Sequence, residues 1–221
     1  MKRPILSLAA FWAIAWSGAA LRAAIIYETA SLGPSDFGGV TVYDRQFLGV
    51  RFQLDNTVIT ESIGGHFTAT VFGNGRIFGA LVRLDDLSDF PDSTDLSTPD
   101  VLGTTLLSPP QFPTPSGDTA GDLHLTLPPG AYAMVFGSGL FGATATAAAP
   151  GQDINVAVPL YIVSSGLEAG SFYQDASQGN ARIRMFVNGI AAPTIPEPAS
   201  LAIWSVLALA GVGFAGWRRR R

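Results

Sequence analysis

The sequence predicts an all-β fold, an antiparallel β-sandwich of the jelly-roll kind, with one apolar segment before it and another after it. Two observations support this prediction for residues 24–188: apolar and polar residues alternate in several short stretches, and Gly or Pro turn signals separate them. This region does not repeat apolar residues at the i, i+3, i+4 spacing of an amphipathic helix. Short strands with frequent turns are typical of sandwiches.

Four stretches show the alternation most clearly, and each predicts a strand with one buried and one solvent-facing side. They are VRFQL at 50–54, GHFTATV at 65–71, DLHLTL at 122–127 and ARIRMFV at 181–187. The turn signals are Asn74-Gly75, Pro128-Pro129-Gly130, Ser138-Gly139 and Asn188-Gly189. In this pattern His66 and His124 both fall on the solvent-facing side of their strands, which predicts two surface histidines.

The N-terminus has the three parts of a secretory signal peptide, which we place at residues 1–23. Lys2 and Arg3 give a positive start, an apolar run follows from residue 5 to 16, and small residues come next. The apolar run is too short to favour a membrane span, although an uncleaved anchor is the alternative. Cleavage after Ala20 and cleavage after Ala23 both fit the sequence.

The C-terminal end predicts a transmembrane helix at residues 199–217, because this stretch of 19 residues contains no charge. At about 1.5 Å per residue, such a helix spans roughly the hydrocarbon core of a bilayer. Trp217 falls at the membrane interface, where indole rings are favoured. A basic cluster follows and should stay in the cytoplasm, which places the rest of the chain outside. The cluster consists of Arg218, Arg219, Arg220 and Arg221.

Residues 189–198 precede this helix and predict an extended linker that ends in Pro196, Glu197 and Pro198. The two prolines fix their own φ angles, and Pro198 also moves Glu197 away from the helical region. Together with the apolar stretch and the arginines, the linker resembles the PEP-CTERM sorting signal of Gram-negative bacteria. The resemblance implies that Pro196, Glu197 and Pro198 are recognised by an exosortase, a membrane peptidase or transpeptidase. It also implies that the helix and arginines retain the chain until processing.

The region before the linker is similar to the β-sandwich ectodomains of the choice-of-anchor type that accompany such tails. Stretches such as FLGVRFQL, SIGGHF and LPPGAYAMVFGSGLFGA carry this similarity. It implies a fold but no catalytic residues. A permanent membrane anchor without processing is the alternative for the tail.

Charge and composition exclude several classes of function. Residues 24–196 contain 16 acidic but only six basic residues, so the region repels phosphate backbones and we expect no binding to nucleic acid. The chain has no Cys, and its single Lys lies in the predicted signal peptide, which removes disulfides and lysine chemistry from the ectodomain. Because the sequence also lacks the common catalytic and metal-binding motifs, we expect no enzyme activity.

The densest group of charges is LDDLSDFPDSTDLSTPD at 84–100, which contains six Asp and no basic residue. Asp89, Asp92 and Asp95 are candidate calcium ligands, because Ca²⁺ prefers oxygen ligands on loops. Asp, Ser, Thr and Pro also form ordinary solvated turns, and this interpretation is favoured because the spacing matches no EF-hand. We therefore expect no cofactor, with calcium as the alternative.

The predicted function is that of an exported protein of the cell surface or extracellular matrix, associated with exopolysaccharide or biofilm. Its predicted partners are the secretion machinery, an exosortase and the membrane through the C-terminal helix, with exopolysaccharide as a further candidate. A lectin-like carbohydrate-binding module and a polysaccharide hydrolase are the alternatives. Candidate aromatics for stacking on sugars are Tyr43, Phe112, Tyr161, Phe172 and Tyr173.

Overall fold

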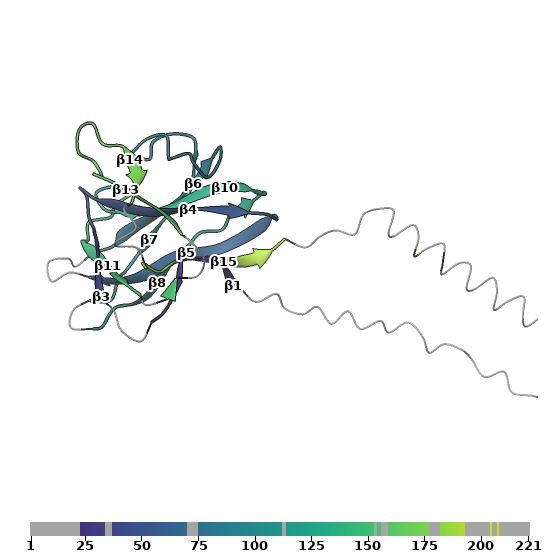
Figure 1. The fold of residues 1–221 in the computed structure, drawn as a ribbon, viewed down its shortest axis with the longest axis horizontal. Coiled ribbons are helices and arrows are strands. Elements are labelled where there is room, and N and C mark those ends of the chain that lie inside the picture. The colour runs from purple at the N-terminus through teal and green to yellow at the C-terminus, as the bar shows by residue number, and fades with distance from the viewer. Residues whose placement is uncertain are drawn as a thin grey trace, which may run out of the picture.

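The computed structural model confirms an all-β fold for the described residues between 23 and 192, with two main antiparallel sheets that pack face to face (Figure 1). It describes residues 23–33, 37–69, 75–111, 114–152, 154–155, 159–176 and 182–192, together with the single positions Trp204 and Leu207. The sorting motif, the terminal arginines and all but residue 23 of the predicted signal peptide at 1–23 lie outside these residues. Within the described residues, no helix has the length and apolarity needed to cross a membrane.

The first sheet contains seven strands and includes both terminal strands of the domain. Its main order is β1 (Ala24–Glu28), β15 (Met185–Ala191), β5 (Val58–Ala69), β11 (Ala147–Gly151) and β3 (Phe37–Val42). Two further strands pair with β5, namely β8 (Gly117–Asp122) and β9 (Thr126–Leu127). A separate two-stranded ladder joins β2 (Ala30–Ser31) to β12 (Ile154–Asn155).

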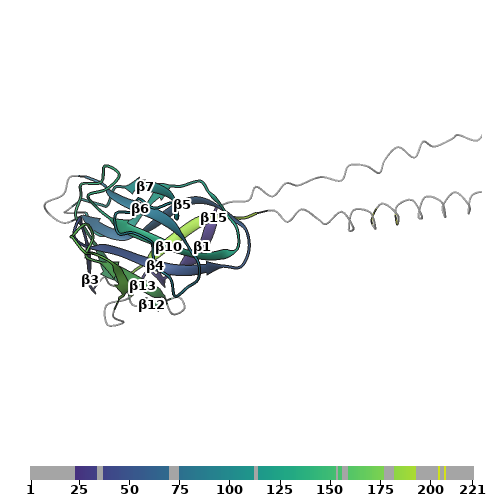
Figure 2. The ribbon, with the colours of Figure 1, turned by 90° about the horizontal axis from the view of Figure 1, so that it is seen from above.

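The second sheet contains six strands, whose side-by-side arrangement is visible in Figure 2. Their order is β14 (Tyr173–Asp175), β13 (Leu160–Ser164), β4 (Phe47–Leu54), β10 (Gly130–Gly137), β6 (Ile77–Leu84) and β7 (Val101–Leu107). Eight strands of the two sheets follow jelly-roll connectivity, with β1-β15-β5-β8 in one sheet and β4-β10-β6-β7 in the other. The pair β13 and β14 extends the edge beside β4.

The main core lies between the sheets and is built by the alternation that the sequence shows. Phe52, Phe67 and Val187 are at most 2% exposed and belong to one apolar cluster. Aromatic pairs connect the layers: the ring centroids of Phe67 and Phe136 are 5.2 Å apart, and those of Tyr27 and Phe52 are 4.6 Å apart. Burial of each large apolar side chain stabilises the fold by about 2–3 kcal/mol.

The outer face of the six-stranded sheet is also buried, where the sequence predicted a solvent-facing side. A second apolar cluster there includes Phe47, Phe78 and Tyr173, and it extends into the loop at 85–100 through Leu87, Phe90 and Leu96. This long loop carries its own apolar residues across the sheet. The three central strands β4, β6 and β10 are therefore buried on both faces, although Arg83 and Gln53 stay exposed.

The last strand continues further than the sequence predicted. Asn188-Gly189 was expected to form a turn and to begin the linker, but both residues belong to β15, which pairs with β5 as far as Ala191. The register shifts between Asn188 and Gly189, and a Cβ on Gly189 would lie 2.4 Å from the carbonyl oxygen of Ile59. Gly189 therefore permits a bulge in the strand. The predicted boundary at 188–189 is wrong, and the sandwich continues to Ala192, whose N–H donates to Thr57 O at 2.9 Å.

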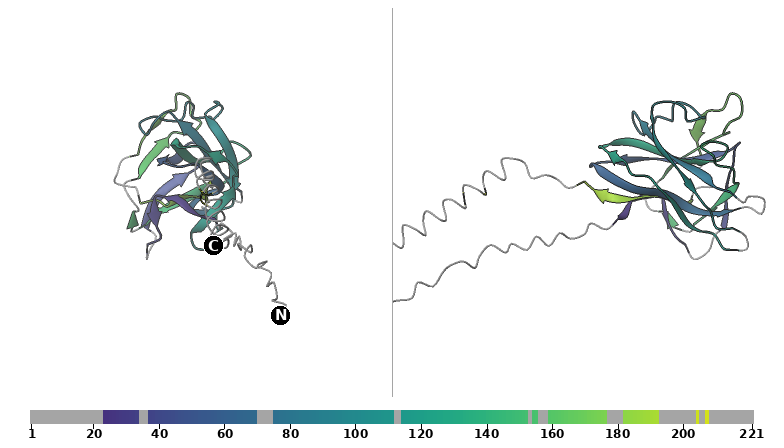
Figure 3. Two further views of the ribbon diagram at one scale, coloured as in Figure 1. Left: turned by 90° about the vertical axis from the view of Figure 1, so that its right-hand side faces the viewer. Right: turned by 180° about the vertical axis from the view of Figure 1, so that it is seen from behind.

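Both ends of the described domain leave from the same end of the sandwich (Figures 1 and 3). The reason is the antiparallel pairing of β1 with β15, in which Ala24 lies opposite Gly189. The first strand therefore begins where the last strand ends. The described chain therefore begins, at residue 23, and ends, at Ala192, at one pole of the domain.

Buried tyrosines make the fold sensitive to alkali. Tyr161 is 4% exposed, and burial raises its pKa to about 12. Burial also raises the pKa of Tyr27 and of Tyr173. In the unfolded chain these phenols ionise near pH 10, so between pH 10 and pH 12 the unfolded state loses protons that the folded state keeps. Stability therefore falls as the pH rises through this window, by about 3 kcal/mol for Tyr161 alone.

We expect the thermal midpoint to be constant near neutral pH and to fall steeply above pH 10, together with the appearance of tyrosinate absorbance. Tyr161→Phe should make the alkaline loss less steep. A midpoint that stays constant up to pH 12 would show that these phenols are not protected by the fold.

Candidate functional sites

A buried polar cluster lies on the outer face of the first sheet and is centred on Arg184, which is 7% exposed. Its Nε donates to both carboxylate oxygens of Asp118, at 3.3 and 3.1 Å. Its Nη1 donates to the carboxylate of Glu28 and, at 2.7 Å, to the carbonyl oxygen of Ala30. These contacts connect β1, β2, β8 and the start of β15, so one guanidinium joins both terminal strands to the sheet.

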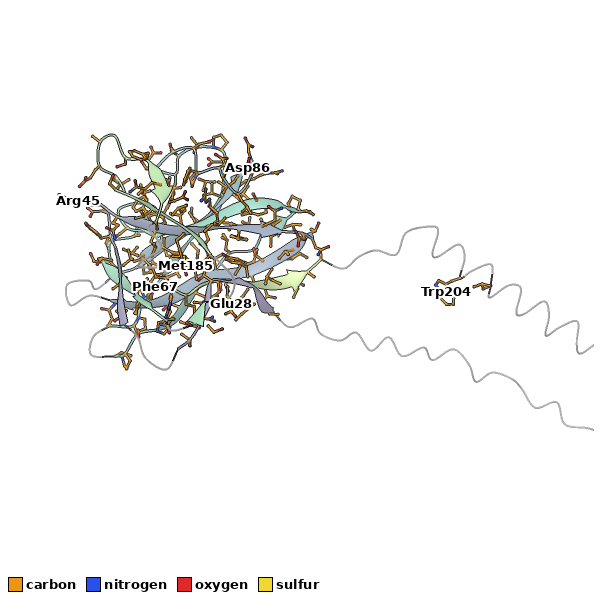
Figure 4. The ribbon with its side chains drawn as sticks, in the orientation of Figure 1. Glu28, Arg45, Phe67, Asp86, Met185 and Trp204 are labelled. Carbon is orange, nitrogen blue, oxygen red and sulfur yellow. The ribbon has the colours of Figure 1, made fainter. Side chains whose placement is uncertain are left out.

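His66 belongs to the same cluster, and the prediction that it lies on the surface is wrong. It is 6% exposed, and its Nδ1 lies 2.9 Å from Asp118 Oδ1. Arg184 and His66 are opposite one another across β15 and β5, which places both side chains on the same side of the sheet. Figure 4 labels Glu28 and Met185, which come from the two terminal strands that the cluster connects. His124, in contrast, is exposed as predicted.

A second buried arginine fastens the acidic loop to the six-stranded sheet. Arg51 on β4 is 5% exposed, because its guanidinium lies beneath the loop, 4.6 Å from the ring centroid of Phe90. It donates to the carbonyl oxygen of Asp89 at 3.3 Å and to the carboxylate of Asp175. The sequence pattern predicted a solvent-facing arginine here, and the only signal for its burial was the apolar content of the loop itself.

The carboxylates of the loop mostly stabilise its own turns. Asp89 accepts from the N–H groups of Asp85 and Phe90, at 3.0 and 2.8 Å. Asp95 accepts from the N–H and hydroxyl of Ser97, and these hydrogen bonds lower its pKa. Asp92 is exposed, and the nearby charge of Asp100 raises its pKa.

The three candidate calcium ligands are thus not gathered around one point. Among the residues that the structure describes, no group of three or more His, Asp or Glu side chains is placed to hold a metal ion. Asp89 and Asp95 each use a carboxylate oxygen in a local turn, which is typical of solvated Asx turns.

Most of the candidate sugar-stacking aromatics are not available at the surface. Tyr161 and Tyr173 are 4% and 6% exposed and belong to the cores, while Tyr43 is half-buried. Phe112 lies outside the described residues. Phe172 is 68% exposed, and a second ring that was not among the predicted aromatics, Phe141, is 42% exposed. A surface phenylalanine in a turn such as SGLFGA carries no signal that distinguishes it from a core residue.

The remaining candidate site is the tail that follows β15. The described domain ends at Ala192, and the next residues contain the Pro-Glu-Pro motif, the uncharged stretch and the arginines. Residues 194–221 match the PEP-CTERM protein-sorting motif. The match confirms the resemblance that the tail shows, and it covers no residue of the sandwich. No curated protein matches the chain.

The PEP-CTERM motif implies an exported protein that is sorted at the membrane and processed by an exosortase. It begins two positions after Ala192, so the sandwich leads into the sorting signal with almost no intervening chain. The residues assigned to the motif, Pro196, Glu197 and Pro198, and those assigned to membrane retention, Trp217 and Arg218 to Arg221, lie within the matched range.

Replacing Arg184 should destabilise the domain, because Asp118 and Glu28 would then lose their shared cation in a partly buried position. We expect Arg184→Leu to lower the free energy of unfolding by about 2–3 kcal/mol, less than for a fully buried pair because both carboxylates retain some contact with water. Urea unfolding measures this difference. Arg83→Leu removes an exposed arginine from β6 and should change stability by less than about 0.5 kcal/mol. Equal effects of the two substitutions would refute the central role of Arg184.

Calcium should leave the melting temperature unchanged, because the loop carboxylates already cap turns and do not converge. The measurement is thermal unfolding in millimolar calcium, with sodium chloride of equal ionic strength as the control. A rise that a chelator reverses and that Asp92→Asn reduces would establish a calcium site in the loop.

Proposed function

We propose that this chain is a non-catalytic protein of the cell surface or extracellular matrix, associated with exopolysaccharide or biofilm and delivered there by exosortase processing. The observation that supports this function is the PEP-CTERM motif, which directly follows a folded sandwich. The motif supplies the export and sorting part of the proposal. The sandwich is then the part that remains outside the cell.

In this proposal each terminal segment has one task. Residues 1–23 direct export, and residues 199–217 form a helix that holds the chain in the inner membrane. The basic cluster at 218–221 keeps the end of this helix in the cytoplasm. Because β1 and β15 lie side by side, both segments connect to the same pole of the domain, which suits a protein attached at one end.

The tether between the sandwich and the Pro-Glu-Pro motif is short. Three residues separate Ala192 from Pro196, and at about 3.3–3.6 Å per step the four Cα-to-Cα steps reach at most about 14 Å. In the proposal the exosortase therefore acts close to the pole where β1 begins and β15 ends. This distance leaves room for an extended substrate strand but for no further domain.

A non-catalytic role is supported by how the described polar groups are used. Arg184, Asp118 and His66 bind one another, and Arg51 binds the loop that covers it. Such contacts leave these side chains engaged in holding strands and loops together. The ectodomain also lacks lysine and cysteine, as its sequence shows.

The test is the fate of the C-terminus in the native host. We expect intact mass to show a mature chain that ends near the Pro-Glu-Pro motif and starts after the signal peptide. Glu197→Ala should leave the chain at its full C-terminal length and attached to the membrane, whereas Asp55→Ala, at an exposed turn of the sandwich, should be processed normally. Normal processing of the Glu197 variant would contradict the assigned recognition role.

A further inference from the structure

Three loops meet at the pole of the sandwich opposite to the terminal strands. They are the turn at 43–46 between β3 and β4, the loop at 138–146 after β10, and the loop at 165–172 between β13 and β14. Strand pairing brings them together, since Phe47 at the start of β4 lies opposite Ser164, and Leu48 lies opposite Phe136. Figure 4 labels Arg45 at this pole, away from the end where the chain leaves the domain.

This pole exposes three large apolar side chains. Phe172 is 68% exposed, Phe141 is 42% exposed and Leu167 is 41% exposed. Phe141 borders the outer apolar cluster, because it contacts Phe78 with ring centroids 5.4 Å apart, and Phe172 is the residue before Tyr173 of the same cluster. We call Phe141, Leu167 and Phe172 the tip patch.

The backbone at Phe141 is strained. Its φ angle is 52°, in the left-handed region that bulky residues rarely adopt. Leu96 has a similar φ of 51°, but its side chain is 3% exposed, so burial offsets its strain. The ring of Phe141 is only partly buried, so its burial offsets less of the backbone strain than the burial of Leu96 does. Strained residues of this kind concentrate at binding sites.

The loops that carry the tip patch hold one another in place. The N–H of Leu167 donates to Asp44 O at 2.9 Å, which joins two of the loops, and the N–H of Gly139 donates to Ala143 O at 3.0 Å within the third. A Cβ on Gly139 would lie 2.9 Å from Leu167 Cδ1, so the two loops are in close contact. The patch is therefore organised before any ligand arrives, which lowers the entropy cost of binding.

Polar groups surround the patch and balance one another. Arg45 and Glu168 form an exposed ion pair at 3.9 Å, and the hydroxyls of Ser165 and Ser171 lie 3.0 Å apart. Asp44 is also exposed, so the charged residues of the three loops are Asp44, Arg45 and Glu168, which leave one net negative charge. A rigid aromatic surface whose polar rim carries no excess of positive charge suits an uncharged ligand that has apolar faces and hydroxyl edges.

We propose that the tip patch binds a neutral polysaccharide chain, with sugar rings stacked on Phe141 and Phe172. A sugar ring presents C–H bonds on its faces and hydroxyls at its edge, which matches the patch and its rim. Three apolar side chains are far fewer than the 20–30 residues that each partner contributes to a standard protein interface. The excess of acidic residues in the ectodomain disfavours a polyanionic ligand. The inference rests on the proposed function, which places this pole outward among extracellular polysaccharides.

Two substitutions separate binding from folding. Phe172→Ala removes a ring that is mostly in water, and Phe141→Gly removes a ring while relieving the left-handed backbone. Each should keep the melting temperature within a few degrees and weaken binding about three- to tenfold, and the double variant should lose binding. The matched control is Ile25→Ala, which removes an exposed apolar side chain, 48% exposed, at the opposite pole.

The measurement is affinity electrophoresis of the exported protein, isolated from its host, in native gels that contain the host's own extracellular polysaccharide. Anion exchange separates this material into a neutral and an acidic fraction, which are used in separate gels. We expect the neutral fraction to retard the wild type and the Ile25 variant but not the double variant. No retardation by the neutral fraction, or equal retardation of all four variants and the wild type, overturns the proposal.

Two further outcomes also overturn it. Retardation by the acidic fraction alone would assign the ligand to polyanions, and self-association that the Phe172 and Phe141 substitutions abolish would assign the patch to a second copy of this chain. Intact mass of the same samples reports on C-terminal processing independently. A chain that binds but is not processed contradicts the proposed sorting, whereas a processed chain that does not bind contradicts only the tip patch.

Discussion

The pairing of β1 with β15 is the contact on which the arrangement of this molecule depends. It places the first and the last strand of the domain side by side at one edge of the first sheet. As a result, both termini lie at one pole. Arg184 strengthens the same contact from the outer face, where it joins Glu28 to Asp118 across the strands. A tail pulled or processed at the C-terminus therefore acts on a strand that is hydrogen-bonded on both sides, to β1 and to β5. Release of this strand would open the whole sheet, so the end that carries the sorting signal is also one of the best-held parts of the fold.

The six-stranded sheet is stabilised differently, because apolar clusters cover both of its faces. Its outer apolar cluster needs the loop at 85–100, and Arg51 holds that loop through Asp89 O, Phe90 and Asp175. The acidic side chains of the loop stay at the surface and cap its turns, while Leu87 and Leu96 face the sheet. The loop thus covers the sheet with its apolar side chains and exposes its charged side chains to solvent. This division explains how a stretch with six aspartates can belong to the packed part of the domain.

The sequence predicted the inner faces of the strands well, since alternation records which side of a strand meets the core. Met185, Phe67 and Val50 are all buried where the period of two placed them. It failed where a distant segment covers an outer face, as for Arg51 and His66, because alternation cannot show what lies above a sheet. The prediction of a turn also failed at Gly189, because glycine is typical both of turns and of the bulge that is present here. The tail was recognisable because its three signals are contiguous in the chain, whereas the tip patch joins loops that are far apart in sequence.

The two poles of the domain differ in a way that agrees with the proposed topology. Asp55, Asp85 and Asp86 are exposed beside the ends of β4 and β6, which pair with the start of β10 at the pole where the chain leaves. Carboxylates are strongly hydrated and favour water over a bilayer interface. Seven Cα-to-Cα steps lead from Ala192 to the predicted start of the helix at residue 199 and span at most about 25 Å. Over this distance the hydrated acidic pole would keep the sandwich above the membrane rather than lying on it. In the proposed topology the apolar tip patch would then face away from the membrane, where it would meet extracellular material.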